Sequence, residues 1–243
     1  MILTEQRDGL LLLTLNRPDR RNAVDLATVH ELIEAIDAVD LSRTKALVLT
    51  GAGGTFCAGA DLTGVESDAN FRHDVTRMLV GLSSLPIVTI AAVDGPALGA
   101  GTQLAIACDL RVATERARFG IPAARLSLMV DPWTVSRLTL TAGHSIARSM
   151  LLVAATIDTE LAVSIGFVHR RGDLDTALAW AQEITQLAPL SIAGHKVMLD
   201  ELQSQPAASD AVVEAISGAW GSADAIEGRT AFLEKRPAQF RGC

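Results

Sequence analysis

The stretch AVDGPALGAGTQLAIACDLR, Ala92–Arg111, passes from the end of one apolar run through a cluster of glycines into a second apolar run. Gly95, Gly99 and Gly101 indicate backbone that approaches another group closely, because glycine has no Cβ to keep that group away. The second run predicts a helix over residues 99–108, and DLRVAT after it predicts a strand. A strand, a turn, a helix and a further strand in this order are typical of an α/β protein.

The same alternation runs through the first half of the chain. Short apolar runs predict strands in GLLLLTLNRP, KALVLTGAGG and PIVTIAAVDG, and apolar residues at helical spacing predict helices in DLATVHELIEAIDAV and FRHDVTRMLVGL. Strands that alternate with helices favour a mostly parallel sheet with crossover helices. After Asp131 the patterns turn helical, and from Pro189 they are helical only. We therefore expect an α/β core over residues 1–189 and a helical C-terminal region over residues 190–243.

The composition excludes several classes of ligand and location. The 243 residues fit one domain, and a formal net charge of -7 argues against binding to nucleic acids or to anionic membranes. No apolar run reaches the roughly 18 residues that a membrane-spanning helix needs. Three cysteines without CxxC spacing indicate a reducing compartment, and MILTEQRDG lacks the apolar core of a signal peptide. We expect a cytoplasmic location.

The common cofactor and nucleophile motifs are missing from the sequence. GAGGTF follows a predicted strand, but the third glycine of a dinucleotide-binding turn would fall at Phe56. The sequence contains neither a GxxxxGK loop nor a GxSxG elbow, and its five histidines are scattered singly. We therefore expect no metal and no cofactor.

Five stretches occur in an order that identifies a family. They are LNRPDRRNAV, FCAGADL, DGPALGAGTQLAIACDLRVA, FGIPAARLSL and EGRTAFLEKRPAQF, and they extend from Leu15 to Phe240. Together they resemble the crotonase (enoyl-CoA hydratase/isomerase) superfamily, and especially an acyl-CoA-binding, hydratase-like paralogue known from mycobacteria. The resemblance implies an α/β spiral of ββα units with a C-terminal helical trimerisation region. It also implies an acyl-CoA ligand and a homo-oligomer, either a trimer or a hexamer.

The resemblance gives a role to the two glycine stretches. Crotonase-like proteins hold a thioester carbonyl, in an oxyanion hole, with two backbone N–H groups that match Ala60 in CAGAD and Ala100 in LGAGT. Each residue follows a glycine, where small residues let a ligand touch the backbone. Ala100 also begins a helix, whose unpaired N–H groups and dipole favour negative charge. The residues alone leave the alternative that both are ordinary turns between strands and helices.

The phosphates of coenzyme A require local cations in this acidic chain. By resemblance, Arg21 flanks CoA with Arg20 beside it, and Lys235 in FLEKR reaches the CoA of an adjacent subunit. Ala58 and Asp61, both in the CAGAD segment, are further predicted CoA contacts. The arginines also fit solvated loop charges, and that alternative stays open.

The residues that activate water in the hydratases are absent. Those enzymes use two glutamates to bind and activate the water that adds to the double bond, and by resemblance they fall at Gln103 and Ala123. An amide orients a water molecule but exchanges no proton at neutral pH, and a methyl group does neither. We therefore expect weak or absent hydration while thioester binding is retained.

Asp131 is the remaining candidate acid or base. By resemblance it falls where some other members of the superfamily, including dienoyl-CoA isomerases, carry an acid. Asp131 before Pro132 also predicts a helix N-cap with proline at the first helical position, and the two roles are compatible.

Five residues are expected to line the acyl pocket: Phe71, Met78, Gln103, Ala123 and Trp133. Phe71 and Met78 also fit an apolar helical stripe that packs in the core, and Trp133 also fits a core aromatic. Residues 62–70, rich in small and polar side chains, are expected to form a loop near the mouth of the pocket.

Two functions therefore stay open. The first is an acyl-CoA-binding or enoyl-CoA-binding protein of fatty acid metabolism that has lost most or all hydratase turnover. The alternative is an active enoyl-CoA hydratase or isomerase, a lyase or isomerase by family, that uses Asp131 as its acid/base.

Overall fold

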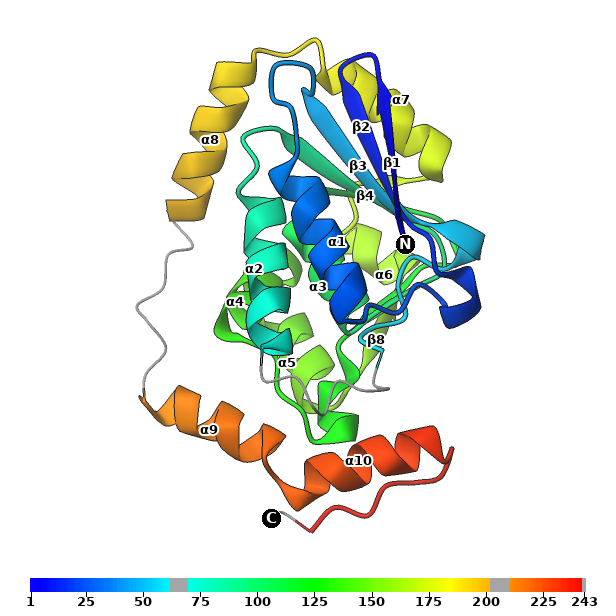
Figure 1. Cartoon of the computed structure of the whole chain (residues 1–243), viewed down its shortest axis with the longest axis vertical. Helices are drawn as coiled ribbons and strands as arrows, with labels where there is room; N and C mark the ends of the chain where they lie inside the picture. The colour runs from blue at the N-terminus through cyan, green and yellow to red at the C-terminus, as the bar shows by residue number, and fades with distance from the viewer. Residues whose placement is uncertain (62–69, 202–209, 242–243) are drawn as a thin grey trace.

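The protein is built around a mostly parallel β-sheet. The computed structural model describes residues 1–61, 70–201 and 210–241, and every element named below lies in these ranges (Figure 1). The strands of the main sheet, in sheet order, are β1 Ile2–Arg7, β2 Leu10–Leu15, β3 Ala46–Gly51, β4 Val88–Val93, β6 Leu110–Ala113 and β9 Arg170–Arg171. β1 pairs antiparallel with β2, and the later pairs are parallel, which confirms the predicted sheet.

Helices cover both faces of this sheet. They are α1 Leu26–Asp37, α2 Phe71–Ser83, α3 Ala100–Ala107, α4 Pro132–Ala142, α5 His144–Leu152, α6 Thr159–Ser164, α7 Leu174–Ile184, α8 Pro189–Glu201, α9 Asp210–Trp220 and α10 Ala223–Leu233. Successive side chains of a strand point to opposite faces. Leu11 and Leu13 of β2 join the core formed with α1, α2 and α3, whereas Leu10 and Leu12 join the core formed with α7. The continuous leucine run is thus explained by burial on both sides.

A second, three-stranded sheet was not predicted. It consists of β5 Pro96–Leu98, β7 Arg118–Gly120 and β8 Thr156–Asp158. Strands of this length contain too few residues to show an alternating pattern. β5 carries the chain from β4 to α3 and ends directly before Gly99, so it positions the glycine-rich turn.

Short polar side chains fix the starts of several helices. Asp25, Asp131, Asp158, Asp173 and Ser222 each accept a hydrogen bond from the backbone N–H three residues later. Such N-caps satisfy a donor that has no partner inside the helix. The predicted start of α4 at Asp131 is confirmed.

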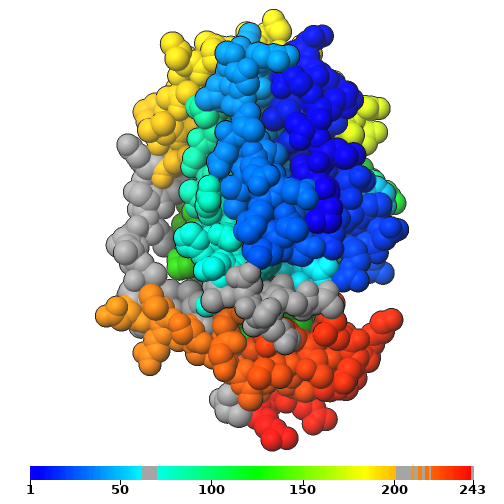
Figure 2. All heavy atoms as spheres, in the orientation of Figure 1, coloured from blue at the N-terminus to red at the C-terminus, as the bar shows by residue number. Residues whose placement is uncertain are grey.

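Specific contacts attach the C-terminal helices to the core. Lys196 of α8 donates from Nζ to a carboxylate oxygen of Asp109 at 2.7 Å and to the carbonyl oxygen of Ile87 at 2.9 Å. α10 packs on the short 3-10 helix η4 Pro122–Leu126, so closely that a Cβ on Gly228 would lie 2.6 Å from the Leu126 carbonyl oxygen. Figure 2 shows α9 and α10 as an orange-to-red layer across one end of the molecule.

The outer surface of α8 is apolar. Leu190, Val197, Met198 and Leu199 are all more than half exposed. Within the described residues, no helix is long and apolar enough to cross a membrane.

Candidate functional site

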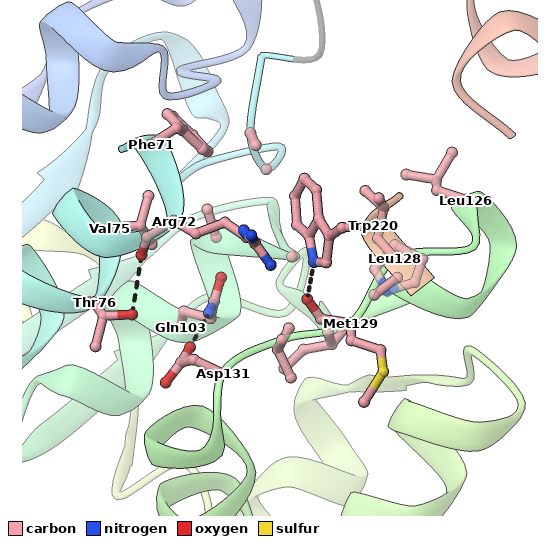
Figure 3. Close-up of a pocket in the computed structure, with 18 of the residues that line it drawn as sticks. Phe71, Arg72, Val75, Thr76, Gln103, Leu126, Leu128, Met129, Asp131 and Trp220 are labelled. Carbon is pink, nitrogen blue, oxygen red and sulfur yellow. Dashed lines mark hydrogen bonds between the residues drawn. The ribbon is translucent and has the colours of Figure 1, made fainter. Parts of the chain in front are cut away.

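A cavity of about 550 Å³ lies between the core and the C-terminal helices (Figure 3). Most of its lining is apolar, and α2, α3, η4, α4, α9 and α10 all contribute to it. The lining includes eight residues that the sequence singled out: Ala58, Ala60, Phe71, Ala100, Gln103, Ala123, Asp131 and Trp133. Segments far apart in the sequence therefore meet at one site.

Two backbone segments lie against each other at the wall of this cavity. The N–H of Cys57 donates to the carbonyl oxygen of Pro96 at 3.1 Å, and the N–H of Leu98 donates to the carbonyl oxygen of Cys57 at 3.0 Å. A Cβ on Gly101 would lie only 2.1 Å from that same Cys57 oxygen. The group that Gly101 approaches so closely is therefore the CAGAD backbone.

This contact places two N–H donors in the cavity wall. Val24 pairs with the backbone on either side of Ala60. Its N–H donates to the Gly59 carbonyl oxygen, and its carbonyl oxygen accepts from the Asp61 N–H. Ala60 lies between these bonds, and Ala100 is the first residue of α3, where a helix leaves its N–H groups unpaired. Among the described residues, neither Ala60 nor Ala100 donates from its N–H. Both N–H groups can donate a hydrogen bond to an oxygen atom of a bound molecule.

The far end of α3 is held by two buried arginines. Arg111 donates to the carbonyl oxygens of Ala105 and Cys108 at 3.1 and 3.0 Å, and Arg137 donates to that of Ile106 at 3.0 Å. Cations at a helix C-terminus complement its dipole. The C-terminal end of α3 is thus satisfied, whereas its N-terminal end at Ala100 borders the cavity.

Gln103 and Asp131 form a hydrogen-bonded cluster with Thr134. The side-chain amide of Gln103 donates to Thr134 Oγ1 at 2.8 Å and to Asp131 Oδ2 at 3.3 Å. Thr134 donates from Oγ1 to Asp131 Oδ2 at 2.6 Å and from its backbone N–H to Oδ1 at 3.0 Å. Figure 3 shows the side-chain oxygen of Gln103 turned away from Asp131. Asp131 thus caps α4 and borders the cavity at once.

The ionisable groups of the cavity are few. Among its described lining residues they are Arg72, His73 and Asp131, and Ala123 contributes a methyl group from η4. Cys57 lies next to the CAGAD turn, but burial raises the pKa of its thiol to about 12, so it is no nucleophile at neutral pH. No group of three His, Cys, Asp or Glu side chains suited to a metal ion occurs in the described ranges.

The predicted CoA contacts lie outside the cavity lining, with the exception of Ala58. The Asp61 carboxylate is buried and pairs with Arg20 at 3.0 Å and with Arg17 at 3.4 Å. It therefore positions these two arginines, and its own contact with CoA stays a prediction. Arg21 is exposed, and its carbonyl oxygen accepts from the Ala58 N–H at 3.0 Å.

Three other predictions have different outcomes. Met78 is fully buried in the core and does not line the cavity, so the helical-stripe interpretation describes its position. Lys235 is exposed just after α10, and its contact with an adjacent subunit stays a prediction. The predicted loop over residues 62–70 lies, except for Asn70, outside the described residues.

The sequence did not indicate that α9 belongs to this site. Trp220, the last residue of α9, lines the cavity. Its Nε1 donates to the carbonyl oxygen of Met129 at 2.9 Å, and the Arg72 guanidinium lies 5.0 Å from its ring centroid. A tryptophan at the end of a predicted helix does not indicate which residues far away in the sequence it will contact.

Comparison with known proteins agrees with this geometry. The family described as enoyl-CoA hydratase/isomerase matches residues 5–243. The probable enoyl-CoA hydratase echA6 of Mycobacterium tuberculosis is 41% identical over 242 residues, which cover 100% of both chains. The chain belongs to the enoyl-CoA hydratase/isomerase family, as the five stretches indicated.

Two solved structures show the same fold. Methylmalonyl-CoA decarboxylase in complex with 2-nitronate-propionyl-CoA has a TM-score of 0.90 at 22% identity, with 100% of this chain and 98% of that chain covered. Carnitinyl-CoA hydratase from Mycobacterium avium has a TM-score of 0.84 at 29% identity, with the same coverage. The crotonase-like fold is therefore confirmed, with its helical C-terminal region.

Proposed function

We propose that this protein binds acyl-CoA or enoyl-CoA thioesters and hydrates them weakly or not at all. The observation that carries the proposal is the cavity wall, where Ala60 and Ala100 offer N–H donors but Gln103 and Ala123 offer no acid or base. The related proteins are named as enoyl-CoA and carnitinyl-CoA hydratases, which supports a CoA thioester as the ligand.

The two N–H groups suit the oxygen of a thioester. Donors fixed in position stabilise an oxygen that gains negative charge, and the loss of one such donor typically costs roughly 2.7–4 kcal/mol in a transition state. α3 adds the positive end of its dipole at Ala100. In this proposal they form an oxyanion hole that polarises the carbonyl.

Hydration fails in this proposal because no positioned pair of groups moves protons. General acid or base catalysis typically contributes about 10²–10⁴ in rate. The Gln103 amide already donates to Asp131 and Thr134, which leaves its oxygen as an acceptor for a water molecule or an acyl group. The methyl group of Ala123 cannot act as the second acid or base.

The second candidate function is a CoA-dependent isomerase or hydratase that uses Asp131. Its support is that the Asp131 carboxylate borders the cavity beside Gln103. Against strong activity stand the three hydrogen bonds that this carboxylate already accepts. A base needs a free lone pair directed at the substrate proton.

The remaining parts of the proposal concern the coenzyme and the assembly. Arg20, Arg21 and Lys235 are the cations proposed for the CoA phosphates. The exposed apolar surface of α8 supports a homotrimer or hexamer, since a patch of this kind commonly marks an interface. A role in cytoplasmic fatty acid metabolism belongs to the same proposal.

Calorimetry with hexanoyl-CoA and with free hexanoate tests the binding claim. The thioester should bind and the free acid should not, because the acid lacks the coenzyme. Ala100→Pro removes one N–H at a helix position that tolerates proline and should weaken binding, whereas Ala100→Gly keeps the donor and should bind like the natural protein. Equal affinity of the two variants would overturn the role of this N–H.

A further inference from the structure

Among the described residues that line the cavity, Arg72 is a cation that thioester binding does not use. Arg72 lies in the first turn of α2, and its guanidinium lies 5.0 Å from the ring centroid of Trp220 (Figure 3). Trp220 is itself fixed by its hydrogen bond to the Met129 carbonyl oxygen. The ring therefore holds the guanidinium at the cavity by a cation–π contact.

The charge of Arg72 is not neutralised by the described residues of the cavity. Asp131 accepts its hydrogen bonds from Gln103 and Thr134, and His73 contacts Asp74 at 3.4 Å. Within the described ranges, no hydrogen bond or ion pair engages the guanidinium. A guanidinium has a planar set of N–H donors that can bind an anion.

The wall around Arg72 is apolar. Phe71, Val75, Leu128 and Met129 line the cavity with it. Such a wall suits a chain of methylene groups, whereas the Arg72 side chain is exposed. A hydrated phosphate fits this wall poorly, and the cations proposed for the CoA phosphates lie outside it.

We propose that the preferred acyl chain ends in a carboxylate, which Arg72 binds. The inference rests on the proposed binding of acyl-CoA, because the thioester oxygen at Ala60 and Ala100 fixes where the chain begins. The chain would then cross the apolar wall and present its far end to the guanidinium. A planar guanidinium matches the two oxygens of a carboxylate. Arg72 is thus a specificity-determining residue.

Matched pairs of ligands test this assignment. Succinyl-CoA, adipoyl-CoA and suberoyl-CoA are compared by calorimetry with butyryl-CoA, hexanoyl-CoA and octanoyl-CoA, which have the same chain lengths without the end carboxylate. At the length that reaches Arg72, the carboxylated ligand should bind at least about tenfold more tightly, as expected for a charge-assisted hydrogen bond. The preference should shrink as salt is raised.

Variants on one helix separate the role of Arg72 from general effects of charge. Arg72→Gln should remove the preference and leave the affinity for the neutral thioesters within about twofold, and Arg72→Lys should keep part of it. Arg77→Gln is the matched control, because Arg77 lies on the same helix, outside the cavity lining, and pairs with Asp37. It should keep the full preference.

Three results would overturn the assignment. The first is equal affinity within every matched pair for the natural protein. The second is an Arg72→Gln variant that weakens all thioesters and free CoA to the same degree, which would assign Arg72 to the CoA phosphates. The third is a failure of both ligand series to bind, which would also overturn the proposed function, whereas the first two leave that function intact.

Discussion

Gln103 donates a hydrogen bond to Asp131 from α3 to the start of α4, with the amide nitrogen 3.3 Å from the carboxylate oxygen. Thr134 joins them, at 2.8 Å from the amide and 2.6 Å from the carboxylate. The amide of Gln103 donates this hydrogen bond, whereas an ionised carboxylate at position 103 could only accept one. The pair therefore explains why glutamine is compatible with Asp131 in this cavity.

Replacing the amide by an acid should make the fold sensitive to pH. In Gln103→Glu two carboxylates face each other, so the pKa of the pair should rise and the folded state should favour the protonated form. Stability should be lower by about 1–3 kcal/mol at pH 7.5 and should recover as the pH falls toward 5. Urea unfolding at both pH values measures this. A Gln103→Met control should lose the same unfolding free energy at both pH values. A pH-independent loss in Gln103→Glu as well would contradict the contact between positions 103 and 131.

Glycine-to-alanine substitutions at two positions should have opposite effects. Gly101→Ala places a Cβ 2.1 Å from the Cys57 carbonyl oxygen, so it should cost about 1–3 kcal/mol and weaken acyl-CoA binding by separating the two backbone segments. Gly194→Ala on α8 meets no atom within 4 Å and should stabilise by roughly 0.5–1 kcal/mol. Thermal unfolding and calorimetry of both variants check this. A stable Gly101→Ala variant with full affinity would refute the proposed geometry.

Much of this fold could be predicted from local patterns. The apolar run of β2, the helical spacing of α1 and the Asp131-Pro132 helix start each depend on neighbouring residues only. The strand β1 is mostly exposed at the sheet edge, and β5, β7 and β8 are short, so neither kind shows a buried pattern. These segments form strands because their backbone pairs with other segments of the chain, which a local sequence pattern does not reveal.

The candidate site was predictable only in part for the same reason. Ala60, Ala100, Gln103 and Ala123 stand in motifs, and the structure brings them to one cavity. Arg72 and Trp220 stand in no motif, and the stretch that contains Phe232 gave no sign that this residue lines the cavity. They reach the cavity because α9 and α10 pack back on η4 and α2, a tertiary contact without any local signal.

His169 should make the folded protein less stable in acid. Burial, and then the nearby Arg111 charge, lower the pKa of His169 to about 4 from its ordinary 6.5, and its Nδ1 accepts from the Arg111 N–H at 3.2 Å. The unfolded chain takes up this proton first, so the contribution is full above pH 6.5 and is lost as the pH falls toward 4.

A variant isolates this contribution from the carboxylates that titrate in the same range. His169→Asn keeps an acceptor but has no titrating group. The difference in unfolding free energy between the natural protein and the variant should change between pH 7 and pH 4, by less than about 1 kcal/mol because solvent screens this partly exposed side chain. A difference that stays constant with pH would contradict the lowered pKa.

Asp131 should contribute separately to stability and to any turnover. Asp131→Asn keeps an oxygen that accepts from the Thr134 N–H, so the helix start and ligand affinity should be retained. Asp131→Ala should cost about 0.5–2 kcal/mol through loss of the cap. If some acyl-CoA is turned over, both variants should abolish that turnover. Turnover that survives in Asp131→Asn would exclude Asp131 as the acid/base.

Crotonyl-CoA hydration, measured beside acyl-CoA binding on the same pure sample, tests the central claim most directly. We predict clear calorimetric binding of the thioester together with hydration at or near the uncatalysed rate, because neither Gln103 nor Ala123 moves a proton. Robust hydration by the natural protein, unchanged in Asp131→Asn, would contradict this account and would require another acid/base in the cavity.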